Sequence, residues 1–325
     1  MKFLILDSRD PYFNLAVEEY LFLHEADDVF MLWQNENTVV VGKNQNAYAE
    51  IKMDVVRERG IKISRRITGG GAVYHDLGNV NYSFISTRKE GSDIDFKYFT
   101  DPIIEALASM GIKAELSGRN DLLTDGRKFS GNAQYSQGER TLHHGTLLFN
   151  ADLTVLSDVL NVDRSKIESK AIASVRSRVI NLSELLGEDI TVEKFIEILS
   201  EFVIKKYSPK IIDVPQNDAV MALTRRNASE EWIFPHKKIT SEYTIVRKER
   251  YNFGIVEIYL QMSNDSITKA TVCGDFFGVG DISELEAALE GARLSEVEAR
   301  LSALLIGDYI FGADAKTLCS LILGE

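Results

Sequence analysis

Apolar and polar residues alternate in several short stretches of the chain. Downstream of three consecutive glycines, Val80, Tyr82 and Phe84 fall on one side of an extended backbone, and polar residues fall on the other. This period of two predicts a half-buried strand. The stretch "GIKISRR", upstream of the glycines, also has the composition of a strand. We therefore predict that the glycines join or bulge two strands, where the backbone is held in one conformation.

Three other stretches carry apolar residues at the spacing of an α-helix. "NLAVEEYLFLHE" predicts a helix that begins at Asn14. "TDPIIEALASMG" predicts a helix with start signals at Thr100 and Pro102 and an end at Gly111. "TVEKFIEILSEFVIKKY" predicts a third helix, whose final lysines suit the negative end of the helix dipole.

Further strands are predicted around these helices. "NTVVVGKNQN" is typical of a buried strand that ends at Gly42, and "GTLLFNADL" of another strand. In "DLLTDGRKFSGNA", Asp125 and Gly126 have the residue types of a two-residue hairpin turn. The order of elements is neither a regular βαβ repeat nor all-β, so the pattern predicts an α+β fold with a largely antiparallel sheet.

A domain boundary is predicted near residue 240, in the polar stretch "EEWIFPHKKITSEY". Two alternating strands, "YTIVRKE" and "FGIVEIYLQMS", follow it, and then "SITKATVCGDFF". Three helices come next, and two of them begin with capping boxes: Ser283 with Glu286, and Ser295 with Glu298. This is enough for a small α+β domain. We expect a catalytic domain over residues 1–240 and an accessory domain over residues 243–325.

Composition narrows the class of protein. The 325 residues include no run of about 20 apolar residues, so no membrane span is expected. The start "MKFLILDSRD" lacks the pattern of a signal peptide, and the two cysteines form no disulfide framework, so the cytoplasm is the expected location. A net charge of −12 argues against a nucleic-acid partner.

Any site for a polyanionic nucleotide therefore needs basic residues of its own. Candidates are Arg65, Arg66, Arg119, Arg127, Lys128, Arg176 and Arg178.

The chain has neither a P-loop nor a dinucleotide-binding fingerprint. Adjacent histidines, His143 and His144, would point to opposite faces of a strand and could not easily share a metal ion. Because both cysteines lie beyond residue 240, a thiol nucleophile is excluded from the expected catalytic domain.

Two features suggest chemistry. Three glycines beside Arg65 and Arg66 could form a backbone concavity that binds an anion. A bare run of three glycines would favour a flexible hairpin tip, but the strands predicted on either side argue against that here. Lys128 follows the predicted turn, and its ammonium could neutralise developing charge, although a lysine at a hairpin tip is usually only solvated. Upstream, Asp121 could hold Mg²⁺ together with phosphate oxygens, or could serve a turn after Asn120.

Five ordered motifs give these features a context: "RRITGGGAVYHDLGN", "GRNDLL", "GRKFSGNA", "HHGTLLFNADL" and "SVRSRVINLSELL". Over roughly residues 1–205 the chain resembles the lipoate–protein ligases of the biotin/lipoate ligase family. The resemblance implies a mixed sheet with helices, like that of biotin ligases and class II synthetases. The C-terminal third resembles the accessory domain of the longer ligases.

The resemblance implies a two-step reaction. Lipoate and ATP form lipoyl-adenylate and pyrophosphate, and the lipoyl group then passes to a lysine of a lipoyl domain. By resemblance, the lysine that contacts the lipoate carbonyl and the α-phosphate is Lys128. The same comparison implies that the substrate- and nucleotide-binding residues are Arg66, Thr68, Gly69, Gly70, Gly71, Ala72, Val73, Tyr74, His75, Asn79, Asn120, Asp121 and His144, with Tyr74 beside adenine and Asp121 near Mg²⁺.

The implied cofactors are ATP and Mg²⁺, with lipoate as substrate. The implied partners are lipoyl-domain acceptor proteins, namely E2 subunits of 2-oxoacid dehydrogenases and the H protein of glycine cleavage.

An octanoyl- or lipoyl-transferase of the same family is the nearest alternative function, but those enzymes use a cysteine in the catalytic domain. A biotin ligase differs in its glycine motif and lysine context. A non-catalytic relative would have no need for Arg66, Asp121 and Lys128.

Overall fold

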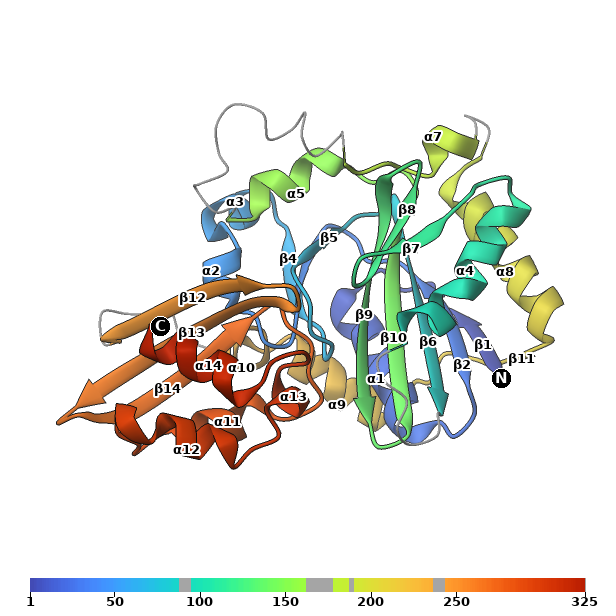
Figure 1. Cartoon of the computed structure of the whole chain (residues 1–325). Helices are drawn as coiled ribbons and strands as arrows, with labels where there is room; N and C mark the ends of the chain where they lie inside the picture. Colours follow the sequence, from blue (N-terminus) through green and yellow to red (C-terminus); the bar gives the residue numbers. More distant parts are fainter. Residues whose placement is uncertain (88–94, 162–177, 187–189, 236–242, 325) are drawn as a thin grey trace. The chain divides into compact units, whose positions relative to one another are not determined.

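The chain divides into two compact units in a computed structural model (Figure 1). The structure describes residues 1–324 except 88–94, 162–177, 187–189 and 236–242. Unit 1 comprises Met1–Val40, Ile51–Arg65 and Val73–Ile233; unit 2 comprises Val41–Glu50, Arg66–Ala72 and Phe234–Glu325. Two N-terminal segments thus belong to the same unit as the C-terminal third. The boundary predicted near residue 240 falls outside the described residues and stays a prediction.

Unit 1 is built on an eight-stranded sheet in the order β11-β1-β2-β6-β10-β9-β8-β7. The neighbours of β1 are parallel to it, and the remaining pairs are antiparallel. This confirms the predicted α+β class with a largely antiparallel sheet. The strands are β1 (Lys2–Ile5), β2 (Val29–Trp33), β6 (Asn79–Thr87), β7 (Glu115–Ser117), β8 (Asp121–Thr124), β9 (Arg127–Gln137), β10 (Arg140–Leu148) and β11 (Lys210–Ile211).

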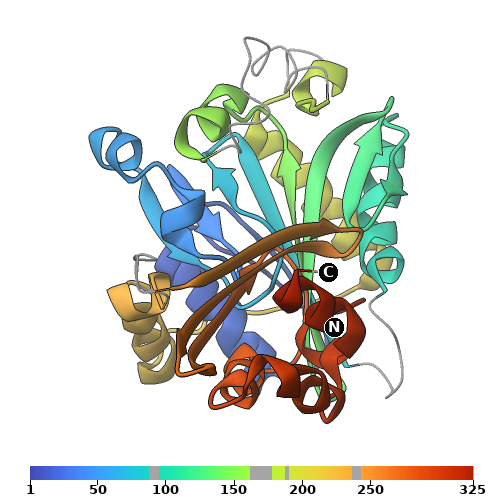
Figure 2. The same ribbon diagram turned by 60° about the vertical axis from the view of Figure 1, so that its left-hand side comes forward.

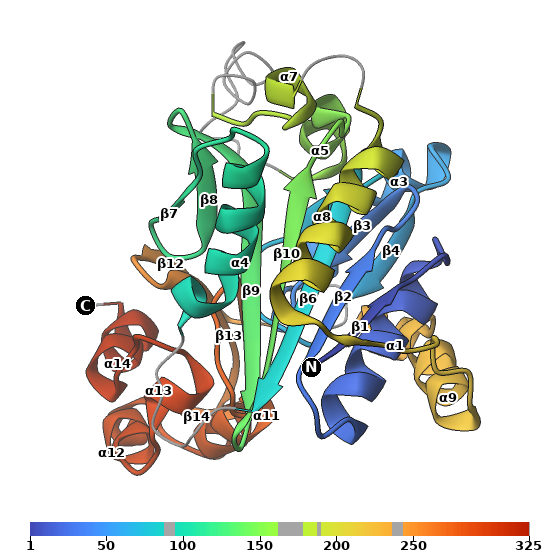
Figure 3. The same cartoon turned by 90° about the vertical axis from the view of Figure 1, so that its right-hand side faces the viewer.

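Two long helices, α4 (Phe96–Ser109) and α8 (Val192–Tyr207), cover one face of this sheet (Figure 3). Their apolar sides pack against inward side chains of β2, β6 and β10 and form the core of unit 1. The other helices of unit 1 are α1 (Pro11–His24), α3 (Met53–Glu58), α5 (Leu153–Val159), α7 (Ser183–Leu186), α9 (Asp218–Asn227) and α10 (Glu230–Ile233).

The sequence placed two helix starts about four residues too late. Helix α1 begins at Pro11 because the Asp10 carboxylate accepts a hydrogen bond from the Tyr12 N–H. Helix α4 begins at Phe96, capped by Asp95, so the predicted start signals lie inside the helix. In both cases an aspartate satisfies an N–H group of the first turn, which is the usual role of an N-cap. The third predicted helix, capped by Thr191, is confirmed.

Strand β6 is more deeply buried than its alternation predicted. Its polar residues Asn79, Asn81 and Ser83 are each at most 2% exposed. The expectation of a half-buried strand was therefore wrong. The inward residues of β6 pack with α4 and α8, and on the other face the Ser83 hydroxyl donates to Glu18 of α1. Both faces of this central strand are therefore covered, and the polar residues line a buried face.

A second sheet places the glycine segment. Strands β4 (Lys62–Arg65) and β5 (Val73–His75) lie on opposite sides of β3 (Thr38–Val41) in the order β4-β3-β5. The glycines thus connect two strands that do not pair with each other, so they are not a hairpin tip. The buried strand predicted to end at Gly42 is confirmed as β3.

Unit 2 contains the predicted C-terminal strands and a set of helices packed against them (Figure 2). Among the described residues after 243, four α-helices follow the strands, one more than predicted. The capping prediction was also wrong: Asp281 caps the first helix, and Glu296 accepts from the Arg293 N–H. The elements are β12 (Ile245–Tyr251), β13 (Gly254–Ser263), β14 (Ser266–Gly274), α2 (Ala47–Glu50), α11 (Ile282–Leu289), a 3₁₀ turn (Leu294–Glu296), α12 (Val297–Ser302), α13 (Ile306–Tyr309) and α14 (Ala315–Leu323).

Within the described parts of both units, no helix has the combined length and apolar character that a bilayer crossing requires.

Candidate functional site

Polar side chains gather on one face of the large sheet in unit 1. The strand register places Asn81 of β6 opposite Thr146 of β10, and Asp121 of β8 opposite Gly131 of β9. The Gly131 N–H donates to the Thr146 hydroxyl over 3.1 Å and joins these pairs into one row. Since directly opposed residues share a face, the row and its neighbours form one surface. We call this surface, made of Asn81, Ser83, Asp121, His144 and Thr146, the polar face.

Lys128 lies at the Asp121 end of the polar face. The predicted Asp-Gly turn is confirmed, with φ of 49° at Asp125 and 72° at Gly126, and it joins β8 to β9. The Lys128 ammonium lies 2.7 Å from Oδ1 of Asp121, and both side chains are more than a third exposed. A Cβ on Gly131 would lie 3.2 Å from the Lys128 ammonium nitrogen, so the absence of a side chain at Gly131 leaves room for the lysine.

The backbone around Lys128 is held from both sides. Its N–H donates to the carbonyl of Arg178, and its carbonyl accepts from the Ile180 N–H. On the other side, Asn120 exchanges hydrogen bonds with Asn132: the Asn120 amide donates to the Asn132 carbonyl over 2.5 Å, and the Asn132 N–H donates to the Asn120 carbonyl over 2.9 Å. These contacts fix the start of β8, where Asp121 stands.

His144 occupies the other end of the polar face. Its Nδ1 lies 2.9 Å from a carboxylate oxygen of Glu18 on α1, and Glu18 is 1% exposed. The same carboxylate accepts from the Ser83 hydroxyl, and this hydroxyl in turn accepts from the Trp33 indole N–H. His143, the adjacent residue, points into the core, where burial holds the pKa of its imidazole well below the usual value. The two histidines thus face opposite sides, as predicted.

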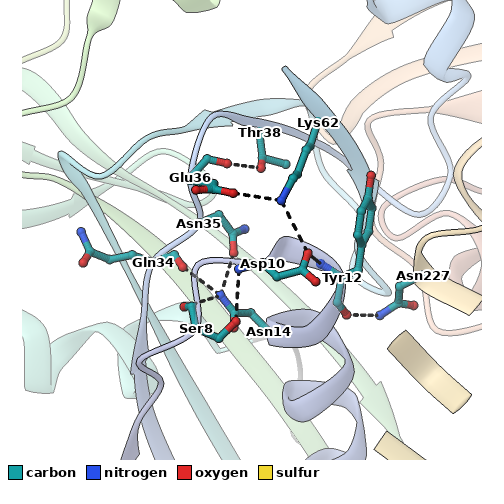
Figure 4. A network of polar contacts seen from close by, with 10 residues as sticks. All are labelled: Ser8, Asp10, Tyr12, Asn14, Gln34, Asn35, Glu36, Thr38, Lys62 and Asn227. Carbon is teal, nitrogen blue, oxygen red and sulfur yellow. Dashed lines mark hydrogen bonds and ion pairs between the residues drawn. The ribbon is translucent and has the colours of Figure 1, made fainter. Parts of the chain in front are cut away.

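His75 on β5 is held by a buried amide chain. The Asn35 amide lies 3.2 Å from Nδ1 of His75. The Asn35 oxygen accepts from the Asn14 amide (Figure 4). Because Asn35 uses its oxygen for Asn14, its nitrogen faces His75, and Nδ1 is then the acceptor. Asn14 also donates to the backbone carbonyls of Ser8 and Gln34, which joins α1 to the end of β2.

The two candidate residues beside His75 also have assigned places. The Tyr74 hydroxyl donates to Oδ1 of Asn37 over 2.9 Å, and burial raises the pKa of Tyr74 to about 12. Its phenol therefore stays neutral at physiological pH. Val73 pairs with Val40 in the small sheet. Asn79 lies in the neighbouring strand β6, where its amide donates to Oδ1 of Asn81 over 2.9 Å.

In unit 2, Arg66 organises the glycine segment. Its guanidinium donates to the Thr68 hydroxyl over 3.0 Å and to the carbonyls of Gly69 and Gly71 over 2.7 Å each. Arg66 is 6% exposed. The buried Arg66 guanidinium thus donates hydrogen bonds to three oxygen atoms within the segment Arg66–Ala72. The Gly69 and Gly71 carbonyls point toward Arg66, while the Thr68 carbonyl accepts from the Lys43 N–H.

Different structural constraints act at the three glycine positions. A Cβ on Gly69 would collide with the Phe276 carbonyl, and Gly70 has a φ of 90°, which favours glycine. Opposite the loop, a Cβ on Gly42 would collide with the Gly70 carbonyl. By contrast, no described atom lies within 4 Å of a Cβ placed on Gly71. The fold itself accounts for Gly69 and Gly70, and only Gly71 is left for a ligand to explain.

Acidic residues form no ready-made metal centre in the part of the chain that the structure describes. Among the described residues, no group of three or more His, Cys, Asp or Glu side chains could hold a metal ion. Asp121, at the exposed end of the polar face, supplies a single carboxylate. This donor set fits Mg²⁺, which commonly takes one or two carboxylates and completes its shell with phosphate oxygens and water.

Two family models match the chain. The lipoyl protein ligase A/B catalytic domain covers residues 10–203, and the bacterial lipoate protein ligase C-terminus covers residues 240–322. The first match alone spans more than half of the chain. The chain belongs to the lipoyl protein ligase A/B family.

Members of this family are similar to the chain over nearly its whole length. The lipoate-protein ligase LplJ of Bacillus subtilis is 39% identical over 313 residues, which cover 94% of this chain and 92% of that protein. Lipoate–protein ligase 1 of Staphylococcus aureus is 36% identical over 332 residues, covering 99% and 100%. Among solved structures, P. falciparum LipL1 in complex with lipoate has a TM-score of 0.82 at 25% identity, covering 100% and 99%. The family is one of ligases, with the two-domain arrangement that the sequence predicted.

In this family member, unit 1 brings several of the predicted residues to one sheet. Asp121, Lys128 and His144 lie along the polar face, and Asn79 and Asn120 lie beside it. Val73, Tyr74 and His75 belong to the small sheet, and Arg66 with Thr68–Ala72 belongs to unit 2. Of the basic candidates, Arg176 falls outside the described residues. Arg65 is buried and donates to the carbonyls of Trp232 and Ile233, so it serves the fold.

Sequence reasoning missed two side chains that hold predicted residues in place. Glu18 lies in an amphipathic helix, where a carboxylate usually faces solvent, and only the fold reveals that it binds His144. Asn132 lies in the small polar run after Lys128. Its position directly after Gly131 was the one sequence signal that it could belong to the site. Its contact with Asn120 depends on strand pairing across the hairpin.

Proposed function

We propose that the protein is an ATP-dependent lipoate–protein ligase that activates lipoate as lipoyl-adenylate and transfers the lipoyl group to a lysine of a lipoyl domain. The observation that carries this is the partly exposed ammonium of Lys128, fixed by Asp121 at the end of the polar face. Family membership and the similarity to a relative in complex with lipoate support the choice of substrate.

In the first step, an oxygen of the lipoate carboxylate attacks the α-phosphorus of ATP, and the bond to pyrophosphate breaks. The carboxylate is itself the nucleophile, so the protein need only position the reactants and stabilise charge. Lys128 is proposed to contact the lipoate carbonyl and the α-phosphate. The Arg66–Ala72 segment is proposed to contact the nucleotide and lipoate through its backbone, with Gly71 at the point of closest approach.

In the second step, the neutral amine of the acceptor lysine attacks the lipoyl carbonyl carbon. The carbon–oxygen bond to AMP breaks, an amide bond forms, and the nitrogen loses a proton. Lys128 would again stabilise the developing negative charge on the carbonyl oxygen and on the departing phosphate. Tyr74, held by Asn37, is proposed to lie beside adenine, and His75, Asn79 and His144 are proposed to shape the walls of the site.

Asp121, with Asn120 beside it, is the residue proposed to hold Mg²⁺. When bound, the ion would neutralise charge on the phosphates and on pyrophosphate as it leaves. Asp121 already accepts the Lys128 ammonium, so its carboxylate has one oxygen directed to the lysine and can offer the other to the ion.

The proposed acceptors are lipoyl domains of E2 subunits and the glycine cleavage H protein, and the proposed location is the cytoplasm. Residues 1–240 are proposed to carry catalysis and residues 243–325 to be accessory. An acyl transferase with a cysteine carrier is disfavoured, because the chain has no cysteine before Cys273 and both of its cysteines are buried.

The decisive experiment is ATP–pyrophosphate exchange with lipoate, octanoate and biotin offered separately to the purified protein. Exchange that depends on lipoate supports the proposal. Exchange that depends only on biotin, or acyl transfer from a carrier protein without ATP, would contradict it.

A further inference from the structure

A buried polar cluster lies beneath the Lys128 hairpin, on the face of the sheet opposite to the polar face. It consists of Asn132 of β9, Tyr82 of β6 and His143 of β10. Asn132 is 3% exposed, and Tyr82 and His143 are fully buried. The register pairs Gly145 with both Tyr82 and Asn132, which brings the three strands together at this point.

The hydrogen bonds give Asn132 a defined orientation. The Tyr82 hydroxyl donates to Oδ1 of Asn132 over 2.5 Å, and Nε2 of His143 lies 3.3 Å from the same oxygen. The Asn132 nitrogen donates to the carbonyl of Asn120 over 3.0 Å. Two further hydrogen bonds join the Asn132 backbone to Asn120: its carbonyl accepts from the Asn120 side-chain amide, and its N–H donates to the Asn120 carbonyl, which makes three in all.

The side chains of the cluster are uncharged, and Tyr82 and His143 each have a fixed protonation state. Burial raises the pKa of Tyr82, so its hydroxyl keeps its proton, and burial lowers the pKa of His143, so the imidazole is uncharged. Within the described structure, Nδ1 of His143 has no hydrogen-bond partner. A buried lone pair without a partner costs less than a buried N–H without one, so the proton belongs on Nε2, facing Asn132.

Space for the cluster is reserved by Gly145. A Cβ at this position would collide with Oδ1 of Asn132, and it would press against the Tyr82 ring. Gly145 needs no unusual backbone conformation, so the close approach of these two side chains is the physical reason for a glycine there.

We infer that Asn132, locked by Tyr82 and His143, is a positioning residue that acts on the reaction through the Asn120–Asp121 corner and Lys128. The inference rests on the proposed function of Lys128. Asn132 lies on the core side of the sheet and does not belong to the polar face. Its link to the reacting atoms is therefore indirect: it holds Asn120, which precedes the aspartate that fixes the ammonium.

The test is a double-mutant cycle on the binding of a non-hydrolysable lipoyl-adenylate mimic, measured by titration calorimetry. We expect Asn132→Ala to weaken binding about tenfold in the wild-type background and less than about twofold in a Lys128→Ala background, because the two residues act as one unit. Equal losses in the two backgrounds, or no loss in the wild-type background, would overturn the inference.

Two further variants separate positioning from loss of stability. Tyr82→Phe keeps the ring and removes the hydroxyl that holds Asn132, so we expect a smaller loss with the same dependence on Lys128. Ser136→Ala deletes a hydrogen bond to Thr141 farther along the same strand and is the matched control, expected to leave binding unchanged. If Ser136→Ala weakened binding as much as Tyr82→Phe at equal loss of thermal stability, the role would be merely structural. If the wild-type protein failed to bind the mimic, the proposed function itself would fail.

Discussion

The ammonium of Lys128 lies 2.7 Å from Oδ1 of Asp121, across the two strands of one hairpin, and both side chains stay more than a third exposed. An exposed ion pair of this kind adds little to stability, typically about 1 kcal/mol or less. The pair is therefore placed where it can meet a ligand. A substitution at Lys128 or Asp121 should then change activity much more than it changes stability.

Lys128→Ala is expected to lower lipoate-dependent ATP–pyrophosphate exchange by roughly a hundredfold or more, the usual scale for removing a group that stabilises transition-state charge. The free energy of unfolding is expected to change by no more than about 1 kcal/mol. Lys97→Ala is the matched control, because Lys97 is also exposed and paired with an aspartate, Asp101. Exchange by Lys128→Ala at the rate of the control would remove Lys128 from the mechanism.

Two glycines separate an effect on stability from an effect on ligand binding. Gly42→Ala is expected to destabilise the protein by roughly 1–3 kcal/mol, because its Cβ would meet the Gly70 carbonyl. Gly71→Ala is expected to change stability by only about 0.5 kcal/mol, since its Cβ enters open space, yet to weaken binding of the lipoyl-adenylate mimic. Thermal melts and calorimetry measure the two effects. Unimpaired binding by Gly71→Ala would mean that the ligand does not approach the loop at Gly71.

The cysteines test the transferase alternative. Cys273→Ala and Cys319→Ala together are expected to keep ligation within about twofold of wild type and to lose roughly 1 kcal/mol of stability per site through small cavities. Ligation is followed by mass spectrometry of a lipoyl domain. A thioester-linked acyl group on the parent protein, with activity lost in the variant, would instead favour a transferase.

Glu50 links stability to pH in unit 2. Burial, followed by repulsion from Glu257, raises its pKa from 4.5 to about 7. The folded state thus binds a proton more tightly than the unfolded state, so this group's contribution to stability falls as pH rises from about 4.5 to about 7. Glu50→Gln is expected to remove that decline and to be worth roughly 2 kcal/mol more at pH 8 than at pH 4.5.

Denaturant titrations at several pH values measure this slope. Glu249→Gln, an exposed site on β12, is the control and is expected to leave the slope unchanged. Glu286, whose pKa burial also raises to about 7, is expected to account for part of the remaining slope. A wild-type slope retained in full by Glu50→Gln would show that Glu50 is ionised in the folded protein at neutral pH.

The parts of the fold that follow from local pattern were predictable from the sequence. The Asp125-Gly126 hairpin is an example, because a two-residue turn needs positive φ and these residue types tolerate it. The start of α1 was missed because Asn14 is also an N-cap residue type, although Asp10 followed by Pro11 is the stronger start signal. The burial of Asn81 and Ser83 was missed because alternation reports which face a residue occupies and cannot report whether both faces are covered.

Within the candidate site, Lys128 and Asp121 were predictable as neighbours, because both lie in one short hairpin motif. Glu18 and Asn132 were not, because each acts across strands or helices that are distant in the sequence. The assignment of the glycine segment to unit 2 has the same cause. The contact between Gly69 and Phe276 joins residues that most of the chain separates, and no local pattern encodes it.

That contact has a consequence for biosynthesis. Domains generally fold as units while the chain emerges from the ribosome, N-terminal parts first. The segments 41–50 and 66–72 are made before most of unit 1, yet the rest of unit 2, which begins at Phe234, is made after it. The glycine segment therefore lacks its contact with Phe276 until that part of unit 2 has been made. A nascent or truncated chain that ends before Phe276 would carry the Lys128 hairpin but would lack the contact that seats the glycine segment.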